Sequence, residues 1–176
     1  MRSRRATPIE VSGLASRDNR RVTSVSVEQI DPYASVWLRQ RVLRPDLTYD
    51  EVVADTAHPD VFAIGAFVER SLVSCVVAYP DLFPAGVAQP AADVADSEVW
   101  RLRGMATDPV HRGQGHGAAV LARMLDDLRL RGARMVWCNA RIPAEGLYRR
   151  AGFATIGEPW VDPVIGPHVR MWRRLG

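Results

Sequence analysis

The chain has 176 residues, of which 47% are hydrophobic, and a formal net charge of +3, values that suit one globular domain with a single core. Its longest apolar runs, 61–68 and 72–79, are far shorter than the ~20 residues of a membrane-crossing helix. The arginines that carry the positive charge are scattered rather than gathered in a stripe with aromatic residues. We therefore expect a protein that binds neither membrane nor nucleic acid.

The first residues differ in composition from the rest of the chain. Residues 1–21 are rich in Arg and Ser and show no hydrophobic period, which predicts a disordered basic tail. They also lack the apolar stretch and the small-residue cleavage site of a secretory signal. We expect residues 22–176 to form a single domain of a cytoplasmic protein.

The chain before residue 58 shows two helix-start signals. Asp31-Pro32 offers an N-cap followed by proline at the first helical position, and Thr48 with Glu51 forms a capping box. In the first helix, Arg39 is among the polar residues that we expect to face outward. Together with an alternation of Val and Ser, these patterns predict a strand at 23–27 and helices at about 32–42 and 48–57.

A hairpin and a long loop are predicted next. Two runs rich in β-branched residues, 62–68 and 72–79, are separated by the polar residues 69–71, a pattern typical of an antiparallel pair. Residues 80–97 contain three prolines, and proline cannot pair within a central strand, so this stretch predicts a loop. Loops of this length often contribute to binding sites.

A glycine-rich segment lies between a predicted strand at 98–107 and a strongly amphipathic predicted helix at 118–131. Its sequence is Arg112-Gly113-Gln114-Gly115-His116-Gly117. Glycines let the backbone approach an anion closely, and the N–H groups at a helix N-terminus converge on it. The segment therefore predicts a pyrophosphate site. It lacks the Lys-Ser or Lys-Thr of a Walker A loop, and no acidic residue follows ~20 positions later to hold a ribose.

The last third of the chain completes a mixed α/β pattern. Its patterns predict a strand at 134–140, a helix at 144–151 and strands at 153–158 and 168–174. Cys75 and Cys138, the two cysteines, each lie in an apolar strand-like run without metal-ligand spacing around them. We expect two buried free thiols and no metal site.

Two segments with consistent spacing resemble a known family. The order of strand, Asp108-Pro109, glycine segment 112–117 and amphipathic helix resembles the CoA-binding motif of the GNAT N-acetyltransferase superfamily. Residues 147–153, Leu-Tyr-Arg-Arg-Ala-Gly-Phe, resemble that family's tyrosine-containing helix and the Gly-Phe after it. The resemblance covers about 23–175 and is best from 100 to 153. It implies an α/β fold with a mixed, mostly antiparallel six- to seven-stranded sheet, splayed between strands 4 and 5 and flanked by about four helices.

The resemblance also implies an acyltransferase that uses acetyl-CoA as co-substrate, with the thioester in the splayed gap. The backbone of 105–107 would bind the pantetheine arm, the N–H groups of 112–117 would bind the pyrophosphate, and Tyr148 would protonate the departing thiolate. The family often has Asn seven residues before this tyrosine. This sequence has Arg141 there, which would reach a phosphate or the tyrosine helix, and Asn139 two residues earlier. The implied cofactor-binding residues are Met105, Ala106, Thr107, Arg112, Gly113, Gln114, Gly115, His116, Gly117, Asn139 and Arg141.

The sequence singles out neither the general base nor the acceptor. Attack on a thioester needs a neutral amine, so some group must take a proton from an ammonium acceptor. Glu98, at the start of the predicted fourth strand, and His168, in the last strand, are both candidates, since an imidazole accepts a proton near neutral pH. The acceptor is expected to be a small-molecule amine or a peptide, bound by the first helices and the loop at 80–97. A homodimer is left open.

Two other classes of function fit parts of the sequence. A non-catalytic, regulatory domain that binds acyl-CoA would use the glycine segment, and Tyr148 would then only pack in the core. A nucleic-acid-binding module would use the arginines of residues 1–21. Attack of an amine on acetyl-CoA accounts for the glycine segment and Tyr148 together, so N-acetyl transfer is the function that we expect.

Overall fold

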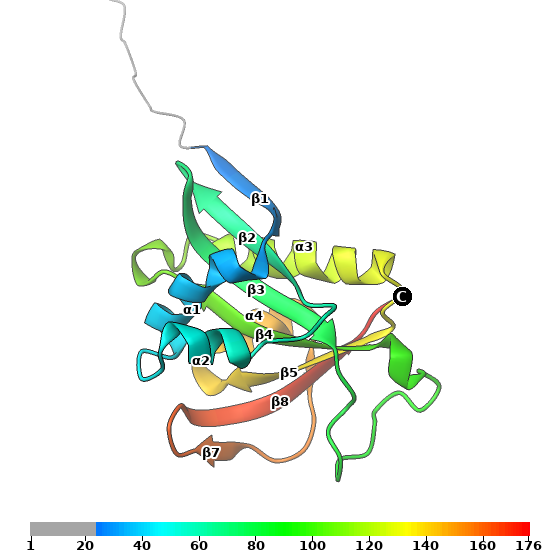
Figure 1. Ribbon diagram of the computed structural model, residues 1–176. Coiled ribbons are helices and arrows are strands. Elements are labelled where there is room, and N and C mark those ends of the chain that lie inside the picture. Colours follow the sequence, from blue (N-terminus) through cyan, green and yellow to red (C-terminus); the bar gives the residue numbers. More distant parts are fainter. Residues whose placement is uncertain (1–23) are drawn as a thin grey trace, which may run out of the picture.

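One sheet of eight strands runs through the part of the chain that the computed structural model describes, residues 24–176 (Figure 1). The tail expected at 1–21 lies outside these residues. The strands are β1 (Val25–Ile30), β2 (Phe62–Val68), β3 (Ser71–Pro80), β4 (Val99–Thr107), β5 (Met135–Arg141), β6 (Ala154–Thr155), β7 (Trp160–Asp162) and β8 (Gly166–Arg174). The helices are α1 (Val36–Leu43), α2 (Tyr49–Ala54), α3 (His116–Leu130) and α4 (Glu145–Arg150), with short 3₁₀ helices η1 (Pro32–Ser35), η2 (Asp96–Glu98), η3 (Pro109–His111) and η4 (Ile142–Ala144).

The sheet is mixed and mostly antiparallel. Its strand order is β1-β2-β3-β4-β5-β8-β6, and β7 pairs with β8 outside this path. Every pair is antiparallel except β4 with β5. The chain leaves β4, forms α3 and returns to β5, which is the crossover that a parallel pair requires. The fold class expected from the sequence is confirmed.

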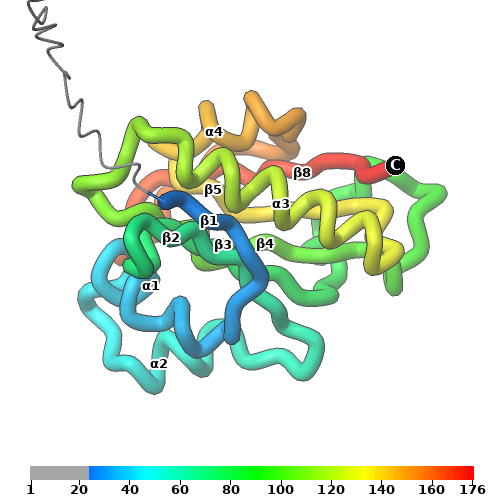
Figure 2. Tube along the Cα trace, turned by 90° about the horizontal axis from the view of Figure 1, so that it is seen from above, coloured from blue at the N-terminus to red at the C-terminus, as the bar shows by residue number. Residues whose placement is uncertain are grey.

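Helices cover both faces of the sheet (Figures 1 and 2). On one face, α3 and α4 bury the largest apolar cluster, in which Leu121 and Met124 of α3 meet Leu102 of β4. On the other face, α1 packs Leu38 against Cys75 and Ala106, and α2 packs on α1. None of the helices within residues 24–176 combines the length and the apolar composition needed to cross a membrane.

Both helix-start signals of the sequence cap a helix, but only one of them caps an α-helix. In α2, Thr48 Oγ1 accepts the N–H of Glu51, and the Glu51 carboxylate accepts the N–H of Thr48 at 2.7 Å, so the capping box is complete. Asp31 caps η1 instead of an α-helix, because its carboxylate accepts the N–H of Tyr33 at 2.9 Å and the α-helix starts at Val36. These capping interactions fix where η1 and α2 begin.

The sheet splays between β4 and β5. These strands pair only through Val99–Arg101 and Met135–Trp137. Past this point β5 continues beside β8, while β4 stays beside β3. The register of β4 also slips by one residue, so that Gly104 and Met105 lie opposite Val76 alone, and Gly104 has a φ of +57°. This β-bulge reverses which side chains of β4 face which helix layer.

Three details differ from the sequence expectation. The strand predicted at 153–158 is reduced to the two residues of β6, because Gly157 takes a φ of +71° and Pro159 follows it. The turn expected before the last strand contains β7, which forms a hairpin with β8, so the described sheet has eight strands. Glu98, predicted to start the fourth strand, belongs to η2, and β4 begins one residue later.

Candidate active site

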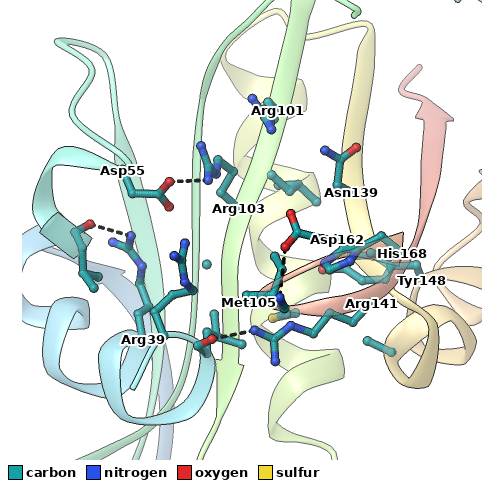
Figure 3. Close-up of a pocket in the computed structure, with 18 of the residues that line it drawn as sticks. Arg39, Asp55, Arg101, Arg103, Met105, Asn139, Arg141, Tyr148, Asp162 and His168 are labelled. Carbon is teal, nitrogen blue, oxygen red and sulfur yellow. Dashed lines mark hydrogen bonds and ion pairs between the residues drawn. The ribbon is translucent and has the colours of Figure 1, made fainter. Parts of the chain in front are cut away.

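A cavity of about 400 Å³ opens where β4 and β5 diverge (Figure 3). Its lining comes from α1 and α2 on one face of the sheet, from α4 on the other, and from the β7–β8 hairpin. Five residues predicted for the site lie in this lining. They are Met105, Asn139, Arg141, Tyr148 and His168. The splayed gap therefore brings together residues from distant parts of the sequence.

Tyr148 reaches the cavity from α4 and is 5% exposed. Its ring packs edge-on against Phe153, with the ring centroids 5.4 Å apart, and its hydroxyl lies beside the Cys138 thiol. Burial, reinforced by that thiol, raises the pKa of Tyr148 well above the usual value for a phenol. The hydroxyl is thus held in its protonated form, ready to donate.

His168 also lines the cavity, from β8, where it is paired in register with Arg141 of β5. Its ring stacks on Trp160, with the centroids 5.7 Å apart. Its Nδ1 lies 2.7 Å from the carbonyl oxygen of Gly166. A carbonyl only accepts, so Nδ1 is the donor in this contact, and Nε2 is the nitrogen left for exchanging a proton with a ligand. The contact with Gly166 therefore fixes the orientation of the imidazole ring.

The glycine segment forms an open turn before α3. Gly113 and Gly115 have φ values of +75° and +86°, and a Cβ on either would meet no atom within 4 Å. Within the described residues, the backbone N–H groups from 113 to 118 donate no hydrogen bond. A Cβ on Gly117 would lie 3.2 Å from Thr107 Oγ1, so this glycine allows α3 to approach the end of β4 closely.

Side chains around this turn also leave polar groups free. His116 is 7% exposed, and its Nε2, like Nδ1 of His111, is buried without a hydrogen-bond partner in the described structure. Arg112 donates from Nε to the carbonyl oxygen of Thr107 at 3.3 Å, and Gln114 donates to Val110. Free N–H groups at a helix N-terminus, beside an arginine, fit the phosphate groups of a nucleotide-like ligand.

The predicted strand segment 105–107 has one free edge. On the β3 side, Ser74 donates to the carbonyl of Ala106 at 3.1 Å and pairs with the Thr107 hydroxyl at 2.8 Å. On the β5 side, pairing of β4 ends at Arg101. Among these three residues Met105 lines the cavity, whereas Ala106 and Thr107 lie outside its lining. The unpaired edge can bond the amide groups of an extended ligand.

Asn139 and Arg141 differ in their surroundings. Asn139 is exposed, and its Oδ1 accepts from Arg170 at 3.4 Å. Arg141, expected to reach a phosphate or the tyrosine helix, instead donates from Nη2 to the carbonyl oxygen of Leu43 at 2.6 Å. This hydrogen bond ties β5 to the C-terminal end of α1, across the mouth of the gap.

Glu98 is not brought to Tyr148. Its carboxylate accepts the N–H of Ala95 at 3.0 Å and lies 3.7 Å from Arg134, at the end of the sheet where β4 and β5 still pair. It is absent from the cavity lining. The sequence could not place it, because the gap opens only beyond Arg101.

The cavity is rich in arginine, a character that the sequence pattern did not indicate. Arg39, expected to face outward from the first helix, is only 2% exposed and packs against Gly104. A Cβ on Gly104 would lie 2.5 Å from Nε of Arg39. The glycine inside a predicted strand was the available signal, because such glycines often mark the close approach of another group.

Comparisons with known proteins agree with this geometry. A family model described as the acetyltransferase (GNAT) family matches residues 27–153. The Bacillus subtilis (strain 168) protein YitI, described as an uncharacterized N-acetyltransferase, is 32% identical over 155 residues, which cover 88% of this chain and 95% of the relative.

Solved structures share the fold. The ribosomal-protein-S18-alanine N-acetyltransferase of Escherichia coli has a TM-score of 0.67 at 16% identity, over 87% of this chain and 95% of that one. An aminoglycoside 6'-N-acetyltransferase complexed with coenzyme A has a TM-score of 0.64 at 13% identity, over 86% and 97%.

Proposed function

Because the chain belongs to the GNAT family of acetyltransferases, we propose that it transfers the acetyl group of acetyl-CoA to the amine of a small molecule or peptide, with Tyr148 as general acid. One observation carries the proposal. Tyr148 lines the splayed gap, and burial raises the pKa of its hydroxyl, which therefore stays protonated. A leaving thiolate in that gap would find a proton donor already in place.

We assign acetyl-CoA to two segments of the chain. The free N–H groups around 112–117 would bind its pyrophosphate, and the unpaired edge of β4 at 105–107 would bind the pantetheine arm. The similarity in fold to a transferase complexed with coenzyme A supports this assignment. Acetyl-CoA supplies an acyl group activated as a thioester.

His168 and Tyr148 then handle the two protons of the reaction. His168 Nε2 takes a proton from the acceptor's ammonium group, which leaves an amine nitrogen able to attack the thioester carbon. As the carbon–nitrogen bond forms and the carbon–sulfur bond breaks, Tyr148 gives its proton to the departing sulfur. The attacking nitrogen, which becomes cationic as the bond forms, gives up its second proton; solvent relays that proton to the Tyr148 phenolate and takes the first one from His168. The products are an N-acetylated acceptor and CoA with a free thiol.

Replacing Tyr148 with phenylalanine tests the proposal. Phe keeps the packing against Phe153 but removes the proton donor. We expect kcat to fall roughly 100-fold or more, while the Kd for CoA, measured by calorimetry, stays unchanged. Turnover is followed by release of the CoA thiol with acetyl-CoA and a panel of amines and peptides. Cys75 and Cys138 are buried, so they will not react with the thiol reagent.

Tyr33→Phe is the matched control, because Tyr33 is 61% exposed and lies in η1, outside the lining of the splayed gap. It should leave both kcat and CoA affinity unchanged. Equal turnover of wild type and Tyr148→Phe would remove the acid role of Tyr148. Binding of CoA without thiol release across the whole panel would instead favour a regulatory domain that binds acyl-CoA.

A further inference from the structure

The splayed gap is lined by more basic than acidic groups. Five arginines and two aspartates, Asp55 and Asp162, contribute to the lining. The arginines are Arg39, Arg44, Arg101, Arg103 and Arg141. A concave site with an excess of one charge attracts ligands of the opposite charge. The surroundings of each arginine show which of them are available to a ligand.

Three of the five arginines are paired with carboxylates. The pairs are Arg103 with Asp55 at 2.5 Å, Arg101 with Asp81 at 3.0 Å and Arg44 with Asp46 at 3.3 Å. The remaining lining carboxylate, Asp162, accepts the N–H groups of Val164 and Ile165 at 2.9 and 3.0 Å. Within residues 24–176, Arg39 and Arg141 have no carboxylate at ion-pair distance.

Arg39 is the more unusual of the two. It is 2% exposed, and its single hydrogen bond in the described structure runs from Nη2 to the carbonyl oxygen of Val52 at 3.1 Å. Its Nε and Nη1 are buried and have no partner. Burial lowers the pKa of this guanidinium, against the smaller opposing effects of Cys75 and Asp55. The charge is therefore destabilised where it stands.

Arg141 faces the same cavity from β5 (Figure 3). It bonds one carbonyl, that of Leu43, and burial together with the neighbouring Arg44 lowers its pKa. Arg141 also lies opposite His168 in the strand register. An anion bound near Arg141 would therefore lie close to the group that we assign as the base.

A buried charge without a counter-ion is costly, and a ligand that supplies the counter-ion recovers that cost on binding. Resting on the proposed function, we infer that the acceptor is a small amine that carries a carboxylate, as an α-amino acid does, and that Arg39 and Arg141 bind this carboxylate. In such a ligand the amine and the carboxylate are attached to the same carbon atom. Anchoring the carboxylate therefore brings the amine toward His168 and Tyr148.

Acetyl-CoA itself does not supply this negative charge. Its pyrophosphate is assigned to residues 112–117, none of which lines the cavity, and its acetyl group is uncharged. A cavity of about 400 Å³ is near the lower end for small-molecule sites, ~300–1,000 Å³, and suits an acceptor of amino-acid size. The arginine cluster therefore selects the acceptor.

Matched ligand pairs test the inference. Phenylalanine, tyrosine and histidine are each compared with the amine that lacks the carboxylate, namely phenethylamine, tyramine and histamine, using acetyl-CoA and the wild-type chain. We expect kcat/KM to be roughly 10- to 100-fold higher for the amino acids, as for loss of a hydrogen bond to a charged group. Calorimetry with the CoA-loaded protein measures binding of the same ligands independently of turnover.

Two variants locate the preference. Arg39→Met should raise KM for the preferred amino acid by that factor more than it raises KM for the decarboxylated partner. Arg141→Gln, at a more exposed site, should also weaken the preference for amino acids over decarboxylated amines. This second variant keeps the inference testable if Arg39→Met does not fold. Arg123→Met is the matched control, because Arg123 lies on α3, pairs with Asp127 and is outside the cavity.

The outcomes separate this inference from the proposed function. Equal turnover of amino acids and decarboxylated amines overturns the carboxylate site but leaves N-acetyl transfer intact. Preference for O-phosphoethanolamine, or for succinyl-CoA over acetyl-CoA in an Arg39-dependent manner, also overturns it, since the charge would then belong to a phosphate or to the acyl group. Without turnover of any amine, the proposed function fails, and Arg39-dependent binding of amino acids by calorimetry decides the inference alone.

Discussion

Gly104 and Arg39 constrain each other. Gly104 has a φ of +57°, and a Cβ added there would lie 2.5 Å from Nε of Arg39 and 2.9 Å from its Cδ. The Arg39 side chain can move little, because it is buried between α1 and β4 and bonded to Val52. The bulge of β4 and the position of the Arg39 guanidinium therefore depend on the absence of a side chain at residue 104.

Gly104→Ala should consequently lower both stability and activity. A residue with a side chain in the left-handed region costs about 1–2 kcal/mol, and the clash with Arg39 adds to this. Gly86→Ala is the control, because Gly86 also has a positive φ of +81° but has no atom within 4 Å of a Cβ position. Urea unfolding should show a clearly larger loss for Gly104→Ala. Equal losses for the two variants would mean that Arg39 moves aside freely.

At the scale of elements, α2 supports the cavity through two contacts. The carbonyl oxygen of Val52 accepts from Arg39, and Asp55, at the end of the helix, pairs with Arg103 of β4. The helix has only six residues, so its own hydrogen bonds cannot sustain it. The Thr48–Glu51 capping box therefore bears on the geometry of the cavity.

Thr48→Ala should destabilise the fold by about 1 kcal/mol, because the N–H of Glu51 loses its acceptor. Thr48→Ser keeps a hydroxyl in place and should stay close to wild type. Thermal unfolding compares the two variants, and KM for the acceptor should rise only in the alanine variant. If serine and alanine behave alike, the cap contributes nothing to α2.

These elements also show what the sequence could predict. The capping box of α2 and the turn of 112–117 before α3 depend on residues close together in the chain, and both have the expected form. Arg39 was predicted to face outward because a helix pattern counts any arginine as polar, and its burial depends on Gly104 in a distant strand. The contact of Arg141 with Leu43 and the distance of Glu98 from the gap are likewise set by tertiary packing.

At the scale of the whole molecule, Asp93 links the long loop between β3 and β4 to the last strand. Its two carboxylate oxygens accept from Arg174 of β8 at 2.8 and 2.5 Å, and Arg134 lies 3.4 Å away. The hydrogen bonds from Arg174 lower the pKa of Asp93 to about 2, despite an opposing effect of desolvation. An unfolded aspartate has a pKa of about 3.9.

The sign of the pH effect follows from this difference. Because the folded pKa is lower than the unfolded one, the link stabilises the fold fully above about pH 4 and is lost as the pH falls toward 2. Asp93→Asn should thus unfold at a lower temperature than wild type at pH 6. This difference in melting temperature should disappear between pH 4 and 2. The effect is small, since the pair is exposed.

Salt provides the control for this prediction. Screening at 1 M ionic strength confines electrostatic attraction to about 3 Å. High salt at pH 6 should therefore reduce the difference in melting temperature between wild type and Asp93→Asn. Asp93→Glu keeps the charge but lengthens the side chain, and it should retain the pH dependence with a smaller amplitude. If the difference in melting temperature between wild type and Asp93→Asn persists unchanged at pH 2, Asp93 stabilises the loop through its packing. Its charge would then not be what joins the loop to β8.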